Sequence, residues 1–422
     1  MALHDGTGSD EELVPPAPNR RLGALSYPEF RLLWFGLIVS NTGSWMAALA
    51  QGWLVVELSP SQALAPFYLG LVGFVRSIPV VLLSGFAGTI ADRVDRRRIL
   101  VIAQIILGLC GLSLAVLSQF HLVRIWHVLL LAALSSATSS FEAPTRQSMV
   151  PLLVGPRDLM NAIGLNSAAF NGPAIFGPAI GGILVGTVGV AMCFYINALS
   201  YVAVLIALAY MTPKPPMSIP ERPGIWQEMM EGLRYVRTHA DIFAICILAA
   251  IVAVIARPYI QLLPAFVKTV MHGGPKVLGA AMAASGAGAL AGSIATAMID
   301  MQRRRGLLLA ASGIATGLSL TLFALSHEIV LALASLVALG ISIMLFMGMT
   351  NTLLQVYTPI EIRGRVMSLY TMIFLGFMPF GSWLLGSAAS LTSLPATLAV
   401  AGLVVAVAGL VVRSRNTLPE LA

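Results

Sequence analysis

Four ionisable side chains lie inside long apolar runs of the sequence: Arg76, Glu142, Arg146 and Arg257. A charge is costly in hydrocarbon, so an ionisable residue within a membrane span is by default a candidate for substrate contact, proton transfer or conformational switching. A guanidinium suits an anionic or zwitterionic ligand, and a carboxylate can bind a proton. These residue types indicate binding and gating rather than bond-making chemistry.

The two isolated arginines lie at similar depth in their runs. Arg76 is 10 residues from Pro66 and Arg257 is 11 residues from Lys268, which is roughly 15 to 17 Å along a helix that rises 1.5 Å per residue. Both are therefore expected near the midplane, as substrate contacts in a central cavity. In the alternative, each guanidinium donates to backbone carbonyls or to a polar neighbour. The candidate neighbours are Asn41, Gln51, Asn171 and Asn197.

Amide and aromatic residues at similar levels are candidates to line the same cavity. Seven of them join Arg76 and Arg257 in the predicted substrate site: Gln51, Asn171, Asn197, Tyr259, Gln261, Asn351 and Gln355. Trp45, Trp53 and Tyr201 are further candidates for its wall, although tryptophan also serves as an interfacial anchor in membrane proteins.

Glu142 and Arg146 are spaced i, i+4, which places them on one face of a helix. Glu142 lies 16 residues after Trp126, roughly 24 Å along that helix and close to its inner end. We expect a latch in which Glu142 pairs with Arg146 or with the arginines that follow Asp92. The alternative makes Glu142 the proton-coupling group of an antiporter.

The composition sets the elements that must position these residues. The chain has 422 residues, of which 58% are hydrophobic and only 10% charged, and its mean hydropathy is +0.88. These values exclude a soluble enzyme and a disordered protein, whereas twelve spans of roughly 20 residues need about 240 apolar positions. Twelve suitable runs begin near Leu32, Pro66, Ile99, Trp126, Ala162, Val190, Ala240, Leu278, Leu307, Ile329, Val366 and Pro395. The sequence therefore predicts an all-α membrane protein with twelve transmembrane helices.

The net charge of +7 reports orientation rather than nucleic-acid binding. Of the 25 Lys and Arg residues, three (Arg124, Lys268 and Lys276) fall on the expected outer loops, two (Arg76 and Arg257) lie within spans, and the remaining 20 fall on expected inner segments. This asymmetry follows the positive-inside rule and predicts that both termini are cytoplasmic.

The order of polar and apolar segments predicts five parts. These are a disordered cytoplasmic tail (1–31), a six-helix bundle (32–212), a cytoplasmic linker (213–239), a second six-helix bundle (240–413) and a short cytoplasmic tail (414–422). Within the linker, Ile225, Met229, Leu233 and Val236 recur at helical spacing, which predicts an amphipathic helix on the inner membrane surface.

The two halves of the chain resemble each other at a shift of about 207 residues. The segment ADRVDRRRILVIA from Ala91 aligns with MIDMQRRRGLLLA from Met298, and at a shift of 208 Gln147 and Pro151 align with Gln355 and Pro359. Two six-helix repeats with a substrate site between them near the midplane are typical of a large class of secondary transporters.

The loop after the second span reads GFAGTIADRVDRRR and resembles the motif G-x-x-x-D-R-x-G-R-R of the major facilitator superfamily. Gly88, Asp92, Arg93, Arg96 and Arg97 match it, and Asp95 replaces the usual glycine. Four further segments resemble the branch that contains the enterobactin exporter and macrolide-efflux proteins: YPEFRLLWFG, EGLRYVR, QLLPAF and RGRVMSLY.

This resemblance implies two conformational devices. Asp92 would pair with the positive N-terminal end of the eleventh span, beside Arg363 and Arg365. The fifth span resembles the antiporter motif of the superfamily, with Pro173 where a glycine is usual. Its matching residues are Gly164, Gly177, Pro178, Gly181 and Gly182. The alternative for that span is ordinary packing of small residues.

No phosphate-binding loop, metal-ligand spacing or nucleophile with a base occurs in the sequence. We therefore expect no cofactor, no metal and no enzymatic activity. The expected function is export of a small amphipathic molecule by a monomer in the bacterial inner (cytoplasmic) membrane, by alternating access with proton antiport. An uptake carrier or facilitator for a sugar, lysolipid or other metabolite is the first alternative, and a non-transporting membrane scaffold is the second.

Overall fold

The computed structural model describes residues 20–93, 95–212, 225–298 and 305–414. Every regular element in this part of the chain is a helix, and 11 helices are long and apolar enough to cross a membrane. The remaining span is α4 (Ile125–Leu153), whose 29 residues equal the length of α13 but include Glu142, Arg146 and several serines. The all-helical fold of twelve spans in two halves is confirmed.

The first half contains spans one to six, and its fifth span is divided in two. The elements are η1 (Arg20–Ser26), α1 (Pro28–Leu58), η2 (Gln62–Leu64), α2 (Ala65–Arg93), α3 (Arg96–Gln119), α4 (Ile125–Leu153), η3 (Pro156–Asp158), α5 (Leu159–Asn171), α6 (Pro173–Val188) and α7 (Val190–Ala209). The division falls at Gly172 and Pro173, because proline has no N–H to continue the helical hydrogen bonds.

The second half follows the amphipathic helix α8 (Ile225–Thr238). Its elements are α9 (Ala240–Ile251), η4 (Val252–Ala256), α10 (Tyr259–Thr269), α11 (Pro275–Met298), α12 (Arg305–Leu325), α13 (Ile329–Tyr357), α14 (Ile360–Thr371), η5 (Met372–Gly376), α15 (Met378–Leu391) and α16 (Leu394–Ser414). The seventh and eleventh spans are each interrupted by a π-helical segment, η4 and η5, a feature that is frequent at functional sites.

Ordered structure begins earlier than the expected tail boundary at residue 31. The backbone N of Ala24 donates to Asn161 Oδ1 at 2.9 Å, and Glu29 accepts from the backbone N of Thr212 at 3.0 Å. Proline at the first helical position starts α1 at Pro28. The part of the chain from Arg20 is therefore tied to the first bundle, and the expectation of a tail through residue 31 was wrong at this end.

The two halves meet near one end of the molecule, which we call the closed end. There α2 packs on α15 and α6 packs on α11. The internal repeat relates these two contacts to each other, because it pairs the second span with the eighth and the fifth with the eleventh. A Cβ added at Gly182 would lie 2.6 Å from the carbonyl oxygen of Pro275, and one at Gly279 would lie 2.7 Å from that of Pro178. Glycine is required here because the helix backbones approach closely.

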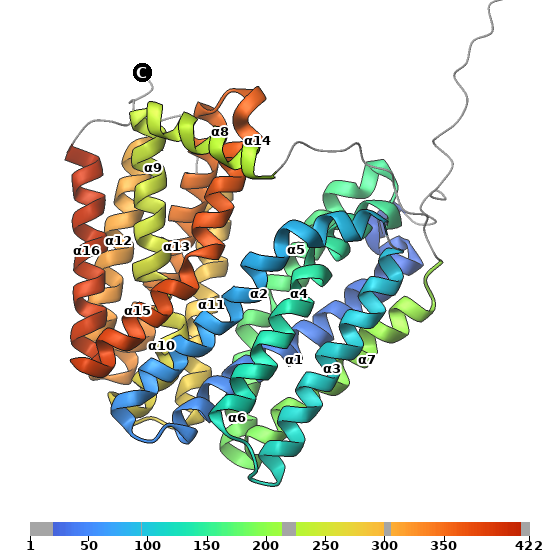
Figure 1. The fold of residues 1–422 in the computed structure, drawn as a ribbon, viewed down its shortest axis with the longest axis horizontal. Coiled ribbons are helices and arrows are strands. Elements are labelled where there is room, and N and C mark those ends of the chain that lie inside the picture. The colour runs from blue at the N-terminus through green and yellow to red at the C-terminus, as the bar shows by residue number, and fades with distance from the viewer. Residues whose placement is uncertain (1–19, 94, 213–224, 299–304, 415–422) are drawn as a thin grey trace, which may run out of the picture.

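The halves diverge toward the opposite end, the open end, which carries α8, η1 and the C-terminal end of α16 (Figure 1). This divergence can be followed along one face of the fifth span. Gly164, Asn171, Pro178 and Gly182 share that face, because they are spaced by seven, seven and four residues. Pro178 and Gly182 are buried against α11, whereas Asn171 is exposed and a Cβ at Gly164 would meet nothing within 4 Å. This face of the fifth span is therefore packed against α11 only toward the closed end.

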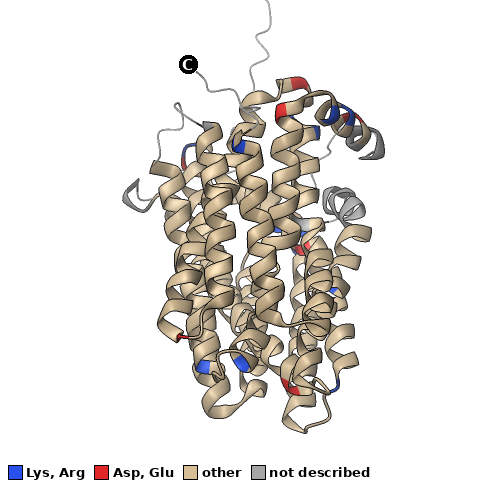
Figure 2. Ribbon diagram, turned by 90° about the vertical axis from the view of Figure 1, so that its left-hand side faces the viewer, with Lys and Arg blue, Asp and Glu red and all other residues tan. Residues whose placement is uncertain are grey.

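Charged residues gather mainly at the two ends of the bundle, and few lie between them (Figure 2). At the open end α8 packs along α14, where Glu231 forms an ion pair with Arg365. A Cβ at Gly232 would lie 3.0 Å from the backbone oxygen of Arg365. Arg234 and Arg237 are exposed, whereas Gly232 and Val236 are buried, so α8 joins the second half along one face.

Gly182→Ala tests whether glycine contacts hold the closed end together. We expect the added methyl group to weaken this end by about 1–3 kcal/mol, because backbone atoms of α11 cannot move aside easily. Spin labels at Thr187 and His272, exposed at the closed ends of α6 and of the second half, should report longer distances in a background without the native cysteines. Gly164→Ala is the matched control, and an equal effect of both substitutions would contradict this account.

Candidate functional site

A polar cavity of about 290 Å³ lies within the first half, between α1, α2, α3, α4 and α7. Three predicted substrate-site residues meet there: Gln51, Arg76 and Asn197, together with Tyr201 from the predicted wall. The other lining residues are Ser44, Ala47, Ala48, Leu107, Cys110, Gly111, Leu114, Ser135, Ser136, Ser139 and Phe194. Among the described residues, the lining contains one cationic side chain and no carboxylate.

Arg76 is held by neighbours on α1 and α4. Its Nη2 donates to Gln51 Oε1 at 2.5 Å, and its backbone carbonyl accepts from Ser136 Oγ at 2.6 Å. In the alternative to substrate contact, Arg76 was expected to donate to a polar neighbour such as Gln51, and this hydrogen bond is present. It uses only part of the guanidinium, which has five N–H donors. In the part of the chain that the structure describes, Arg76 forms no ion pair.

The sequence analysis missed the hydroxyl groups of this cavity. Ser44 Oγ lies 3.3 Å from Asn197 Oδ1 and 3.3 Å from the hydroxyl of Tyr201. Ser135, Ser136 and Ser139 contribute a second hydroxyl-rich wall from α4. The run SSATSS within an otherwise apolar span was the signal that could have identified them.

Arg257 lies in the second half, directly after the π-helical segment η4. Its Nη1 is 3.8 Å from Met347 Sδ, and its guanidinium carbon lies 5.0 Å from the ring centroid of Phe374 on η5. A cation over an aromatic face is attracted by the ring quadrupole. Among the described residues Arg257 has no ion pair either, but it does not line the cavity of Arg76.

Five other predicted substrate-site residues lie elsewhere. Tyr259 OH is 2.5 Å from Ser285 Oγ on α11, and Gln261 Nε2 donates across the closed end to the carbonyl of Leu69 at 3.3 Å. Gln355 donates to Asn351 one turn away on α13. Asn171 donates to the Ser167 carbonyl at 3.0 Å and is exposed. The structure therefore does not bring these five to one site.

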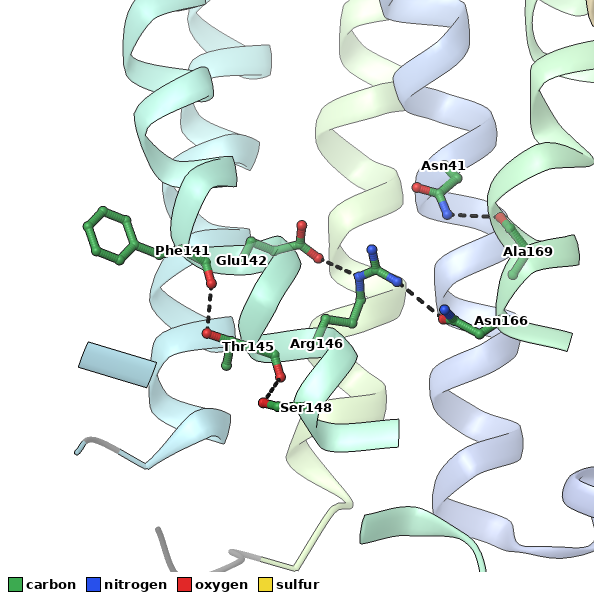
Figure 3. A network of polar contacts seen from close by, with 8 residues as sticks. All are labelled: Asn41, Phe141, Glu142, Thr145, Arg146, Ser148, Asn166 and Ala169. Atoms are coloured by element: carbon green, nitrogen blue, oxygen red, sulfur yellow. Dashed lines mark hydrogen bonds and ion pairs between the residues drawn. The ribbon is translucent and has the colours of Figure 1, made fainter. Parts of the chain in front are cut away.

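Glu142 and Arg146 form the expected pair on α4, with Arg146 Nε 2.9 Å from Glu142 Oε1 (Figure 3). Arg146 Nη1 also donates to Asn166 Oδ1 on α5 at 3.2 Å, and its guanidinium carbon lies 4.4 Å from the ring centroid of Phe170. The side chain of Arg146 is only 3% exposed and that of Glu142 14%. The pair thus joins α4 to α5 within the first half.

Arg363 and Arg365 lie on α14 at the open end. Arg365 pairs with Glu231 of α8, and Arg363 Nε donates to the Thr358 carbonyl at 3.3 Å. The surroundings of Gly88 and the side chains of Asp92 and Arg93 lie outside the described residues.

The loop after α2 shows what replaces the usual glycine of the motif. Asp95 is the N-cap of α3, because its Oδ1 accepts from the backbone N of Arg97 at 2.9 Å. Arg97 Nη2 donates to the Ala209 carbonyl at 3.1 Å. Arg96 is buried, and its Nε and Nη1 have no hydrogen-bond partner among the described residues.

The family model described as transmembrane secretion effector matches residues 20–422. Among curated proteins, macrolide efflux protein A of Streptococcus pyogenes is 23% identical over 84% of this chain and 87% of its own length. The staphyloferrin A transporter of Staphylococcus aureus is 26% identical over 86% and 89%. The enterobactin exporter of Shigella boydii is 22% identical over 89% of both.

Solved structures share the fold. A bacterial homologue of the iron transporter ferroportin, in an inward-facing state, matches with a TM-score of 0.70 at 18% identity. The match covers 92% of this chain and 99% of that one. The expected resemblance to macrolide-efflux and enterobactin-export proteins is confirmed.

Glu142→Gln tests the coupling between Glu142 and Arg146. We expect it to destabilise the protein by about 3–5 kcal/mol, because removing one partner leaves a buried guanidinium without its carboxylate. Arg146→Gln and the double variant complete a cycle measured by thermal unfolding in detergent. The double variant should lose less stability than the sum of the two single variants, and additive losses would contradict a coupled pair.

Proposed function

Because this chain belongs to the transmembrane secretion effector family of the major facilitator superfamily, we propose that it exports a small amphipathic molecule across the bacterial inner membrane by alternating access. The family and its relatives are multi-pass membrane transporters, not enzymes. Export, proton antiport and a monomeric state extend beyond this family assignment. The efflux and export named for its relatives support the proposed direction.

The observation that carries the proposal is a guanidinium without an ion pair inside a polar cavity. A buried charge costs free energy unless it is paired, so natural spans retain an isolated arginine where it serves substrate or ion. Arg76 meets this description in the first half. Arg257 in the second half also has no ion pair among the described residues, but it lies outside that cavity. We propose that the two halves share the substrate, with its polar group bound near Arg76.

The direction of opening follows from the distribution of charge. The positive-inside rule assigns the end with α8 and most Lys and Arg residues to the cytoplasm. The open end then faces the cytoplasm, and the glycine contacts of α6 and α11 seal the outer side. This is the state in which an exporter loads its substrate.

The inner gate is proposed to involve the arginines of α14. In the open state Arg365 is paired with Glu231 of the linker helix. When the halves close at this end, the loop after α2 approaches α14, and Asp92 can then meet the N-terminal end of that helix. If Arg365 leaves Glu231 and pairs with Asp92, movement of the linker helix α8 would be coupled to closure of the two halves at this end.

Proton coupling is assigned to the region of Glu142. The carboxylate is mostly buried and is paired with Arg146 on α4. As a latch, the pair holds α4 against α5 in one conformation. As a proton carrier, Glu142 would release Arg146 on protonation, because a neutral carboxyl loses its ion pair.

Everted membrane vesicles that contain the protein test export by proton antiport. With a proton-sensitive dye inside, addition of a transported siderophore, macrolide or amphipathic dye should reduce the pH gradient, because protons leave as substrate enters. Vesicles with Arg76→Gln should respond several-fold less, whereas Arg157→Gln, an exposed arginine, should match the wild type. No response to the panel counts against antiport, and accumulation only in right-side-out vesicles identifies an uptake carrier.

Glu142→Gln in the same vesicles separates the two roles of Glu142. The latch hypothesis predicts slower turnover with substrate transport still coupled to protons, since a gate contact affects rate rather than stoichiometry. Loss of proton movement with continued substrate exchange would instead identify Glu142 as the proton carrier. Glu328→Gln, an exposed acid away from the proposed inner gate, is the control and should leave both rates unchanged.

A further inference from the structure

Gln51 carries an unused donor in the cavity of Arg76. Its side chain is only 7% exposed, and its Nε2 has no hydrogen-bond partner in the described part of the chain. Buried amide groups in folded proteins are nearly always hydrogen-bonded. The free amide nitrogen beside the guanidinium therefore indicates a position at which a ligand can supply a hydrogen-bond acceptor.

The orientation of this amide is fixed by Arg76. Amide oxygen and nitrogen are assigned from the hydrogen-bond network, and Arg76 Nη2 donates to Gln51 Oε1 at 2.5 Å. The reversed amide would set Nε2 against another donor. The oxygen of Gln51 must consequently face Arg76, and its nitrogen remains available to an acceptor other than the guanidinium.

The other donors around this cavity suit an anionic group. The guanidinium retains N–H donors beyond the one used by Gln51, and Ser135 and Ser139 add hydroxyls to the wall of the cavity. No carboxylate lines the cavity among the described residues, and within this part of the chain the single positive charge has no ion-pair partner. A planar anion with two oxygens can accept from a guanidinium and from a neighbouring amide at the same time.

We propose that this cavity is a carboxylate-binding subsite, in which Arg76 and Gln51 Nε2 together hold one carboxylate of the transported molecule. The inference rests on the proposed export function and specifies its substrate class. One cation matches one singly charged carboxylate. A volume of about 290 Å³ accommodates the anionic end of a substrate, and the rest of a larger molecule extends beyond this cavity.

The second half has different chemistry around its arginine. Arg257 is covered by the ring of Phe374 and the sulfur of Met347, both of which are polarizable and largely apolar. This surface suits the apolar or aromatic part of the same molecule. An amphipathic carboxylate would therefore bind asymmetrically, with its anion in the first half.

The test uses dansylglycine, an amphipathic fluorescent carboxylate, and dansylglycinamide, its neutral counterpart. Fluorescence titration of the purified full chain in detergent should give at least about tenfold tighter binding of the carboxylate, because the amide leaves the cationic donors without an anion. Arg76→Gln should abolish this preference. Arg76→Lys should retain part of it, since the charge remains while the planar fork is lost.

Two substitutions of Gln51 sharpen the assignment. Gln51→Leu removes the free donor and should reduce the preference several-fold, whereas Gln51→Glu places a carboxylate beside Arg76 and should abolish binding by supplying an internal counterion. Arg157→Gln and Gln147→Leu, at exposed positions, are matched controls that should behave as the wild type. Each variant should elute as a single folded species before titration.

Equal affinity for the two probes, or no binding of either to the wild type, would overturn the carboxylate subsite. A preference that survives in Arg76→Gln would overturn it as well. These outcomes are separate from failure of the proposed export. Carboxylate binding without export in vesicles would leave the subsite intact, and export of cationic compounds alone would leave the exporter without this subsite.

Discussion

The cost of an unpaired charge in a membrane governs where the functional groups of this protein can lie. Arg76 and Arg257 have no ion pair within the described residues, and each is stabilised by weaker contacts: an amide for Arg76, a ring and a sulfur for Arg257. Such contacts hold a guanidinium without neutralising it. The result is two cationic groups, one in each half, that have no ion pair among the described residues.

This arrangement depends on a second constraint, the close approach of helix backbones at the closed end. Gly182 and Gly279 let α6 and α11 meet without side chains between them, and the repeat places α2 against α15 in the same way. Because the contact is confined to one end, the halves can diverge at the other. The same glycine-rich span thus packs closely on α11 at the closed end and is exposed toward the open end.

Hydropathy and charge were enough to predict the twelve spans, the two halves and the location of the linker helix. Depth along the helices also brought Gln51, Arg76 and Asn197 to one level, and these three share a cavity. Rotation around the helix axis could not be predicted, because apolar side chains surround most spans on every face. Tyr259 and Gln261 therefore lie at helix contacts, although their depth resembles that of Arg257.

Serines were overlooked because a serine in a span usually donates to the carbonyl of its own preceding turn. Ser136 instead donates to the carbonyl of Arg76 on another helix, a contact that only the fold reveals. The pairing of Arg365 with Glu231 was also not predicted, since it requires α8 to lie along α14. Both cases depend on the packing of segments far apart in sequence.

Intracellular accumulation in a strain that lacks this protein tests the central claim most directly. Cells without it should accumulate at least one amphipathic carboxylate from a panel of toxic compounds, and the wild-type chain should restore clearance. The Arg76→Gln chain, expressed at equal level in the membrane, should fail to restore it while Arg157→Gln succeeds. Equal clearance by Arg76→Gln, or accumulation unchanged by the wild-type chain, would contradict export through the cavity of Arg76.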